Sequence, residues 1–121
     1  MRKIYLVEDD QGIREVLEVF LALEGFEVHS FVSVREFQER DTDVIPDLYL
    51  FDVNLPDGSG IDLCQQIKSD DHNQNVPVII MSAHANMHHL NKLCDPDEMI
   101  SKPFDIDNLL FRIKDVIKLR K

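Results

Sequence analysis

The sequence predicts an α/β fold, with a single doubly wound, five-stranded parallel sheet and helices on both faces. Apolar runs alternate with helical patterns from one end of the 121-residue chain to the other. The runs lack the polar alternation of a half-exposed sheet, which indicates strands covered on both faces. The length suits one domain with one core, so residues 1–121 are expected to form a single unit.

The first two strand–helix units are predicted in the N-terminal third of the chain. Residues 4–7 form an apolar run, and residues at helical spacing follow it: Ile13, Val16, Leu17, Phe20 and Leu21. Gly25 is expected to end this helix in a left-handed conformation. Residues 28–31 predict the second strand. Ser33 and Glu36 form a capping-box pair that opens the second helix.

Three more units are predicted in the rest of the chain. Residues 48–51 predict the third strand, and a turn-rich stretch at 54–60 leads into a helix that carries Ile61, Leu63, Cys64 and Ile67. Residues 76–81 predict the fourth strand, and the short apolar patch at 99–100 predicts the fifth. Asp105 is expected to cap the last helix.

Composition excludes several classes of function. The net charge of −10 argues against nucleic-acid binding by this domain, because phosphate backbones would be repelled. No apolar run reaches the ~20 residues of a membrane helix, and the N-terminus has no secretory signal pattern. We therefore expect a cytoplasmic protein in which Cys64 and Cys94 are reduced thiols, although a disulfide between them is possible in principle.

Chemically active side chains stand at the ends of the predicted strands. The strand ends, in chain order, carry Glu8-Asp9-Asp10, Asp52, Ser82 and Lys102. Ligands of open parallel sheets lie beyond the carboxyl ends of the strands, so these side chains are expected to meet at one edge. Each has a structural explanation when taken singly, since Asp10 can cap a helix and Ser82 or Lys102 can be solvated. Their convergence is harder to explain by structure alone.

Carboxylates held at such an edge require a cation. Two carboxylates ~4 Å apart repel by ~4 kcal/mol at an effective dielectric constant of about 20. Hard oxygen ligands with an open side suit Mg²⁺, which prefers one or two carboxylates plus a phosphate. Once neutralised, the site would admit a phosphoryl group, and an aspartate could accept it as the nucleophile. Such a transfer needs mainly positioning and charge stabilisation, which Mg²⁺ and Lys102 could provide.

Four motifs resemble those of response regulator receiver domains, the phosphoacceptor modules of two-component signalling that include the chemotaxis receivers. They are Val7-Glu8-Asp9-Asp10, the loop from Asp52 through Pro56 to Gly60, Ile80-Met81-Ser82-Ala83 and Lys102-Pro103-Phe104. The likeness covers essentially the whole chain, in the right order and spacing. It implies the flavodoxin-like strand order 2-1-3-4-5.

The resemblance implies a phosphorylation site and a metal site. Asp52 would accept the phosphoryl group from a histidine of a sensor kinase or phosphotransfer protein, and the modified domain would act on an output domain or downstream partner. Asp9 and Asp52 would bind Mg²⁺ directly, together with the backbone carbonyl of Asn54. Glu8 would act on the metal largely through water.

The resemblance also implies roles around the phosphoryl group. Lys102 would pair with Asp52 and then with a phosphoryl oxygen, and its bond to Pro103 is usually cis in the family. Ser82 would move to hydrogen-bond the phosphoryl group, and Ala83 would leave the site open. Asn54 and His84 occupy the two positions that line the path of the hydrolytic water.

Two features depart from the family pattern. Met99 stands three residues before Lys102, where the family usually has an aromatic switch residue. The segment 83–98 is about two residues short, and Cys94-Asp95-Pro96 replaces the usual turn of small residues. Because Pro96 ends any helix by about Asp95, we hypothesise that the fourth helix is short, displaced or mobile.

Three other functions fit parts of the pattern. A haloacid-dehalogenase-type phosphohydrolase would need a second aspartate where Asn54 stands. A flavodoxin-like cofactor binder would need backbone N–H groups for phosphate where the acidic residues 8–10 stand, so no organic cofactor is expected. A phosphorylation-inert interaction module fits Met99 and the short 83–98 segment but leaves the intact acidic site unexplained. We expect a signalling domain whose chemistry is confined to its own phosphorylation and dephosphorylation.

Overall fold

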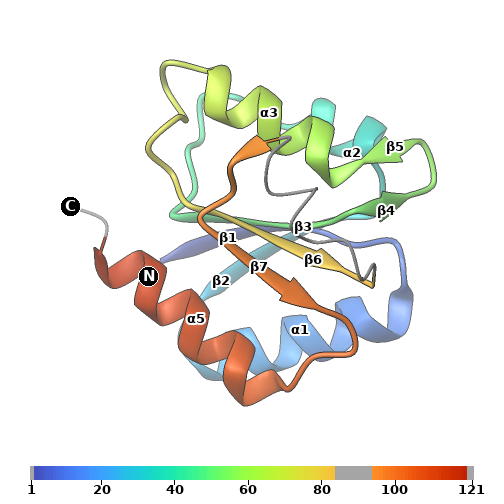
Figure 1. The fold of residues 1–121 in the computed structure, drawn as a ribbon, viewed down its shortest axis with the longest axis vertical. Helices are drawn as coiled ribbons and strands as arrows, with labels where there is room; N and C mark the ends of the chain where they lie inside the picture. The colour runs from blue at the N-terminus through green and yellow to red at the C-terminus, as the bar shows by residue number, and fades with distance from the viewer. Residues whose placement is uncertain (1, 84–93, 120–121) are drawn as a thin grey trace.

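The central sheet has the predicted architecture (Figure 1). The computed structural model describes residues 2–83 and 94–119. Five parallel strands form one sheet in the order β2-β1-β3-β6-β7, namely β1 Lys3–Val7, β2 Glu27–Phe31, β3 Leu48–Asp52, β6 Val78–Ser82 and β7 Glu98–Ser101. The predicted fold class and the strand order 2-1-3-4-5 are both confirmed.

Helices cover both faces of this sheet. On one face lie α2 Val34–Gln38 and α3 Gly60–Ser69, and on the other lie α1 Gln11–Leu23 and α5 Ile106–Leu119. The predicted caps are present. Asp10 Oδ1 accepts the backbone N–H of Ile13 at 3.0 Å, and Ser33 Oγ accepts that of Glu36 at 3.1 Å. Gly25 ends α1 with a φ of 91°, in the left-handed region that glycine favours.

Two local predictions need correction. The turn-rich stretch after β3 contains a two-stranded antiparallel hairpin, β4 Asn54–Leu55 and β5 Gly58–Ser59, which the sequence did not predict. The fourth strand starts at Val78 and not at residue 76. Pro77 has no N–H to donate to the neighbouring strand, and only its carbonyl joins the sheet, accepting the N–H of Tyr49 at 3.0 Å.

The two faces of the sheet pack against cores of different character. Towards α2 and α3 the core is aromatic, and its rings meet largely edge to face with centroids 5.3–6.0 Å apart: Tyr5, Phe31, Phe37, Tyr49 and Phe51. Towards α1 and α5 it is mainly aliphatic, as Ile4, Leu6, Leu48 and Leu50 illustrate. Alternate residues of β1 and β3 thus pack into the cores on opposite faces of the sheet. Because both faces are buried, the apolar runs are uninterrupted.

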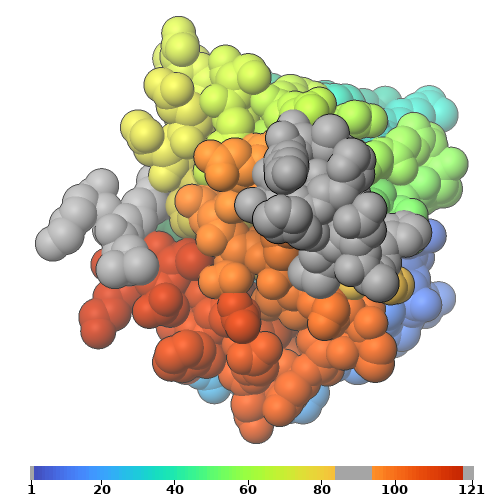
Figure 2. Space-filling model, viewed as in Figure 1, coloured from blue at the N-terminus to red at the C-terminus, as the bar shows by residue number. Residues whose placement is uncertain are grey.

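The turn before β7 is built without glycine. Cys94 is buried, and Asp95 follows with a φ of 54°, a left-handed conformation that few non-glycine residues adopt. The hypothesis about the fourth helix concerns residues 84–93, which lie outside the described residues. In Figure 2, β7 (orange) lies at the surface of the viewed face, between the region of α3 (green) and that of α5 (red). Among the described helices, none has the length and apolar character needed to cross a membrane.

Candidate functional site

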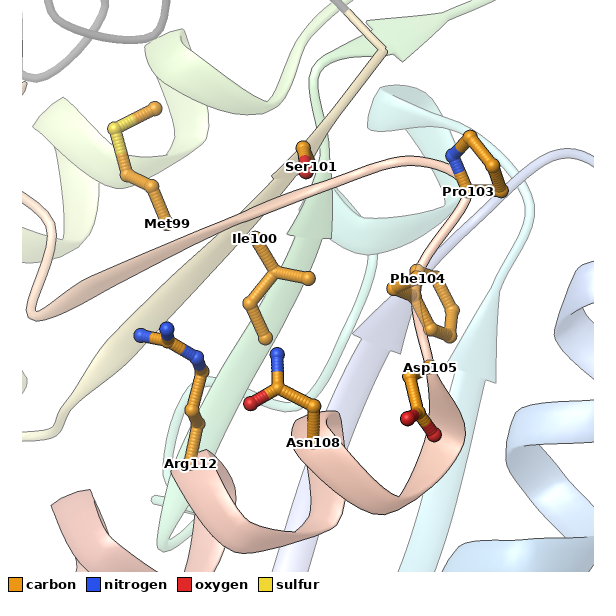
Figure 3. A pocket seen from close by; sticks show the side chains of 8 residues that line it. All are labelled: Met99, Ile100, Ser101, Pro103, Phe104, Asp105, Asn108 and Arg112. Atoms are coloured by element: carbon orange, nitrogen blue, oxygen red, sulfur yellow. The ribbon is translucent and has the colours of Figure 1, made fainter.

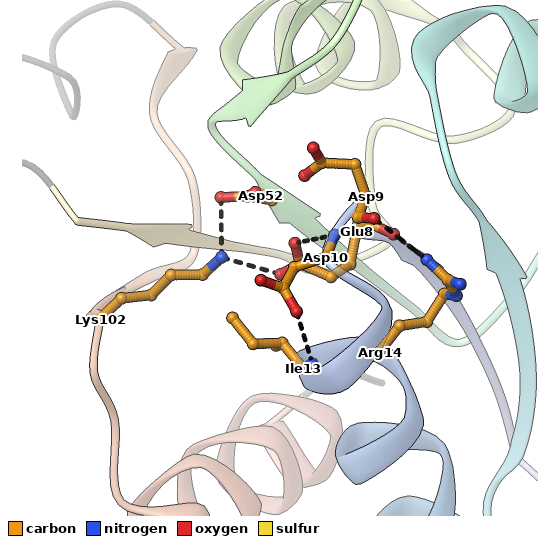
Figure 4. A network of polar contacts seen from close by, with 7 residues as sticks. All are labelled: Glu8, Asp9, Asp10, Ile13, Arg14, Asp52 and Lys102. Atoms are coloured by element: carbon orange, nitrogen blue, oxygen red, sulfur yellow. Dashed lines mark hydrogen bonds and ion pairs between the residues drawn. The ribbon is translucent and has the colours of Figure 1, made fainter.

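The carboxyl ends of three strands bring the predicted acids and the lysine together (Figure 4). β1 and β3 are parallel neighbours with Val7 opposite Phe51, so the residues that follow this pair, Glu8 and Asp52, lie side by side. One carboxylate oxygen each from Glu8, Asp9 and Asp52 lie within 4.8 Å of one another. This acidic cluster is the convergence that the strand ends predicted.

Lys102 directly follows β7, an edge strand of the sheet, and its side chain reaches the cluster from there. Its ammonium Nζ lies 2.8 Å from Glu8 Oε1 and 3.2 Å from Asp52 Oδ1. The pairing with Asp52 is the one that the resemblance implied, whereas the shorter contact with Glu8 was not predicted. The peptide bond between Lys102 and Pro103 is cis, as the resemblance also implied.

Burial makes the electrostatics of this cluster unfavourable. Glu8 is fully buried, and burial raises the pKa of its carboxyl group; the Asp52 charge adds to this rise, and the hydrogen bond from Lys102 opposes it. Burial alone would lower the pKa of Lys102, but its bond to Glu8 and the charges of Glu8 and Asp52 outweigh burial and raise it. Among the described residues, three carboxylates face one ammonium, so this part of the cluster keeps an excess of negative charge.

Two polar residues that the sequence analysis passed over hold the surrounding loops. Arg14, in the first turn of α1, donates from Nη1 to the backbone carbonyls of Glu8 at 3.1 Å and Asp9 at 3.4 Å. Asp57 caps α2 with both carboxylate oxygens, which accept the N–H groups of residues 34 and 35 at 2.8 and 2.9 Å. These two backbone bonds lower the pKa of Asp57. An aspartate in a turn is a candidate helix cap, but the neighbouring sequence does not indicate which helix it caps.

The glycine eight residues after Asp52 has a steric role. A Cβ on Gly60 would lie 2.2 Å from the carbonyl oxygen of Asp52 and 3.0 Å from Cβ of Phe51. No real side chain tolerates such a contact, so only glycine lets α3 begin this close to the end of β3. Ser59 Oγ caps α3 by accepting the N–H of Ile61 at 3.0 Å.

The remaining predicted residues occupy different surroundings. Ser82 is buried at the end of β6, one residue beyond the Asp52–Met81 pair of neighbouring strands. Asn54 is exposed in β4, and Ala83 is exposed after β6. Met99 is partly buried in β7 and packs against the aromatic core. His84 lies outside the described residues, so its predicted role is not placed.

Two hollows flank the loop that joins β7 to α5. One, of about 320 Å³, lies over β7 and the start of α5 and includes Met99, Phe104, Asn108 and Arg112 in its lining (Figure 3). The other, of about 490 Å³, lies between this loop and α1, and its lining includes Ile13, Val16, Lys102 and Phe104. The second hollow therefore opens directly beside the lysine of the acidic cluster.

The chain matches the response regulator receiver domain family over residues 4–114. The transcriptional regulatory protein GltR of Pseudomonas aeruginosa is 34% identical over 119 residues, which cover 97% of this chain and 49% of GltR. The response regulator ArlR of Staphylococcus saprophyticus is 33% identical over 120 residues, which cover 98% of this chain and 53% of ArlR. The chain thus spans about half the length of these two relatives.

Solved structures agree with this match. The non-phosphorylated HemR receiver domain of Leptospira biflexa is 29% identical with a TM-score of 0.88, and the match covers 100% of this chain and 98% of that one. The response regulator TrrA of Thermotoga maritima, solved in complex with Mg²⁺-BeF, shares the fold at a TM-score of 0.82 and 24% identity, covering 96% of this chain and 99% of that one. Sequence, fold and acidic edge agree, and the chain belongs to the response regulator receiver domain family.

Proposed function

We propose that residues 1–121 act as one receiver domain in which Asp52 accepts a phosphoryl group in a Mg²⁺-dependent reaction. The observation that carries this proposal is the uncompensated charge of the acidic cluster. Glu8, Asp9 and Asp52 share a space 4.8 Å across with Lys102 as the described cation in contact with it. A divalent cation would neutralise the remaining charge, and a doubly negative phosphoryl donor could then approach.

The donor set of the cluster fits Mg²⁺. All of its ligand atoms are oxygens, and Asp9 is exposed, so one side of the site is open to water and phosphate. Asp9 and Asp52 would hold the metal with the carbonyl of Asn54. Glu8 is already engaged by Lys102 at 2.8 Å, which favours an indirect role through water. The metal would supply charge neutralisation at the transferred phosphoryl group.

Individual side chains would then have separate roles in the phosphoryl transfer. A carboxylate oxygen of Asp52 attacks phosphorus, the bond from phosphorus to the donor nitrogen breaks, and the histidine leaves with the electron pair. Lys102 lies 3.2 Å from Oδ1 of Asp52 and is placed to hold a phosphoryl oxygen. Ser82 would donate its hydroxyl to the phosphoryl group. Asn54 and His84 would line the approach of the water that later hydrolyses the acyl phosphate.

The donor protein would dock on the apolar flank of α1. Val16, Phe20 and Leu23 are 47%, 39% and 74% exposed, and they lie on one side of the helix. The hollow beside Lys102 continues this flank towards the site. Apolar side chains that gather in one patch on an exposed helix face, as these three do, are typical of a surface that a partner covers. We assign the flank to the sensor kinase or phosphotransfer protein, because whatever delivers phosphate to Asp52 must contact the neighbouring surface.

The phosphorylated domain would act on an output domain or a downstream protein. Its own chemistry would be limited to gaining and losing the phosphoryl group. The expected cytoplasmic location stays a prediction.

Intact-protein mass spectrometry with acetyl phosphate or phosphoramidate tests the central step. With Mg²⁺ the chain should gain the mass of one phosphoryl group, and chelation of the metal should abolish the gain. Asp52→Asn should show no gain. The matched control Asp71→Asn, an exposed carboxylate outside the cluster, should behave as wild type. A chain that gains no mass with any donor would contradict the proposal.

A second experiment separates docking from chemistry. Phe20→Asp should slow transfer from a phosphorylated histidine phosphotransfer protein about tenfold or more, because it places a charge in the apolar contact. The same variant should react normally with acetyl phosphate. Ile45→Asp, at a similarly exposed site (38%) in the segment between α2 and β3, is the control. Equal transfer rates in all three proteins would remove α1 from the docking surface and leave the phosphorylation proposal standing.

A further inference from the structure

Cys64 and Cys94 are the two cysteines of the chain, and the fold brings them into contact. Cys64 lies in α3 and is fully buried, whereas Cys94 lies at the edge of the same aromatic core and is 7% exposed. The thiol of Cys64 donates to the backbone carbonyl oxygen of Cys94, with Sγ and O 3.5 Å apart. Neither thiol takes part in the proposed phosphorylation.

A second contact holds the same two segments together. Lys68 follows Cys64 by one turn of α3, and its Nζ lies 2.6 Å from Asp97 Oδ2. Asp97 Oδ2 also accepts the backbone N–H of Val78 at 2.7 Å, which anchors this segment to β6. α3 is therefore attached to residues 94–97 at two successive positions, and the Cys64 sulfur is kept beside the backbone of Cys94 without a covalent bond.

The surroundings give the two thiols different reactivity. The neighbouring Cys94 side chain is the main cause that raises the pKa of Cys64, and burial raises it further. The Cys64 side chain in turn lowers the pKa of Cys94; burial and the Asp95 charge oppose this shift, and the Lys68 charge supports it. Cys94, the more exposed of the two residues, is therefore assigned the role of nucleophile, and Cys64 is assigned the role of the partner behind it.

We propose that Cys64 and Cys94 form a reversible intramolecular disulfide, which makes this pair a thiol-oxidation site. The oxidant is a small disulfide of the glutathione type. The Cys94 thiolate attacks one sulfur of the oxidant, forms a mixed disulfide and releases one thiol. Cys64 then loses its proton, attacks the Cys94 sulfur and displaces the second thiol. The protein pair loses two protons and two electrons, and the oxidant gains them.

The bond would act on the segment that leads into β7. It would tie α3 covalently to residue 94, close to the strand that carries Met99 and ends beside Lys102. Oxidation would therefore restrain the connection that delivers Lys102 to the acidic cluster. This inference does not depend on phosphorylation, since neither cysteine belongs to the acidic cluster.

Oxidation of the folded wild-type chain with oxidised glutathione tests the proposal. The product should be monomeric on a non-reducing gel and two hydrogen masses lighter than the reduced chain. Peptide mapping should find one cross-link between residues 64 and 94, and reduction should reverse it. In a separate alkylation of the reduced folded chain, Cys94 should react about tenfold or more faster than Cys64, a comparison that requires no variant.

Single variants show whether the reaction follows the proposed order. Cys64→Ser should stop at a glutathione adduct on Cys94, because the resolving thiol is gone. Cys94→Ser should remain largely unmodified. The proposal is overturned if the wild type accumulates an unresolved adduct on Cys94, if the cross-link joins two chains, or if both thiols react only after unfolding in urea.

Discussion

The strand β3 runs through two regions of opposite physical character. Tyr49 and Phe51 are fully buried in the aromatic core, where Phe37 meets both rings edge to face with centroids 5.9 and 5.3 Å away. The next residue, Asp52, is also buried but faces Glu8 and shares Lys102 with it. Phe51 therefore makes contacts that stabilise the fold, whereas the next residue, Asp52, places its carboxylate close to the carboxylate of Glu8.

This difference separates the source of stability from the source of function. Burial of uncharged rings stabilises the fold at no electrostatic cost. Buried carboxylates lose hydration, and one ammonium offsets only part of that loss. The aromatic core should therefore respond to loss of volume, and the acidic cluster to added cations and to pH.

Loss of a ring from the aromatic core should have the largest effect. Phe37→Ala should lower the free energy of unfolding by about 3–5 kcal/mol, because Phe37 is fully buried among several rings and its removal leaves a cavity. Urea unfolding followed by circular dichroism measures it. Phe111→Ala, at a site 68% exposed, is the control and should change stability by less than about 0.5 kcal/mol. A loss below about 1 kcal/mol for Phe37→Ala would contradict the assignment of stability to this core.

Binding of Mg²⁺ should stabilise the acidic cluster by a smaller amount. At one hundred times its dissociation constant, Mg²⁺ should raise the free energy of unfolding by about 2.7 kcal/mol. Asp9→Asn should weaken Mg²⁺ binding about tenfold or more, because it removes a carboxylate from the open side of the site. Phe37→Ala should keep the full gain, since the core is not part of the site. If Asp9→Asn gained as much as wild type, the metal would have to bind elsewhere.

Alkaline pH should lower the free energy of unfolding through one titratable group in each region. Burial raises the pKa of Tyr49 to about 12, so the folded state retains this proton above pH ~10, where the unfolded state loses it. Lys102 also has a raised pKa, so its contribution is present below pH ~10.4 and is lost as the pH rises through its folded value. Both terms predict falling stability above pH ~10.

Two variants separate these alkaline contributions in urea unfolding between pH 8 and pH 12. Tyr49→Phe should remove the aromatic part of the fall and leave the part that belongs to Lys102. Glu8→Gln should reduce the latter part, because Glu8 is the main cause that raises the pKa of Lys102. A fall that neither variant changes would assign the alkaline loss to other groups.

The smallest expected effect lies outside both regions, in the turn before β7. Asp95 has a φ of 54°, which a side chain disfavours and glycine adopts freely. Asp95→Gly should therefore raise the free energy of unfolding by about 0.5–1 kcal/mol without changing Mg²⁺ binding. Asp95→Ala is the comparison and should not stabilise. A destabilised glycine variant would show that the aspartate side chain stabilises the turn.

Much of this protein could be predicted from local pattern. The apolar runs and helical spacings gave the order of strands and helices, since burial on two faces and amphipathic periodicity are written in neighbouring residues. The capping positions at Asp10, Ser33 and Gly25 followed from the same short-range chemistry. The strand ends also predicted the edge where Glu8, Asp9 and Asp52 meet.

Other features were decided only by the tertiary structure. Lys102 pairs with Glu8 across 94 positions of sequence, and Asp57 caps a helix more than 20 positions before it. The contact between Cys64 and Cys94 depends on how α3 lies beside the entry to β7. Such pairings are set by distances between segments that only packing brings together. The sequence determined which chemical groups reach the site, and the fold determined which of them touch.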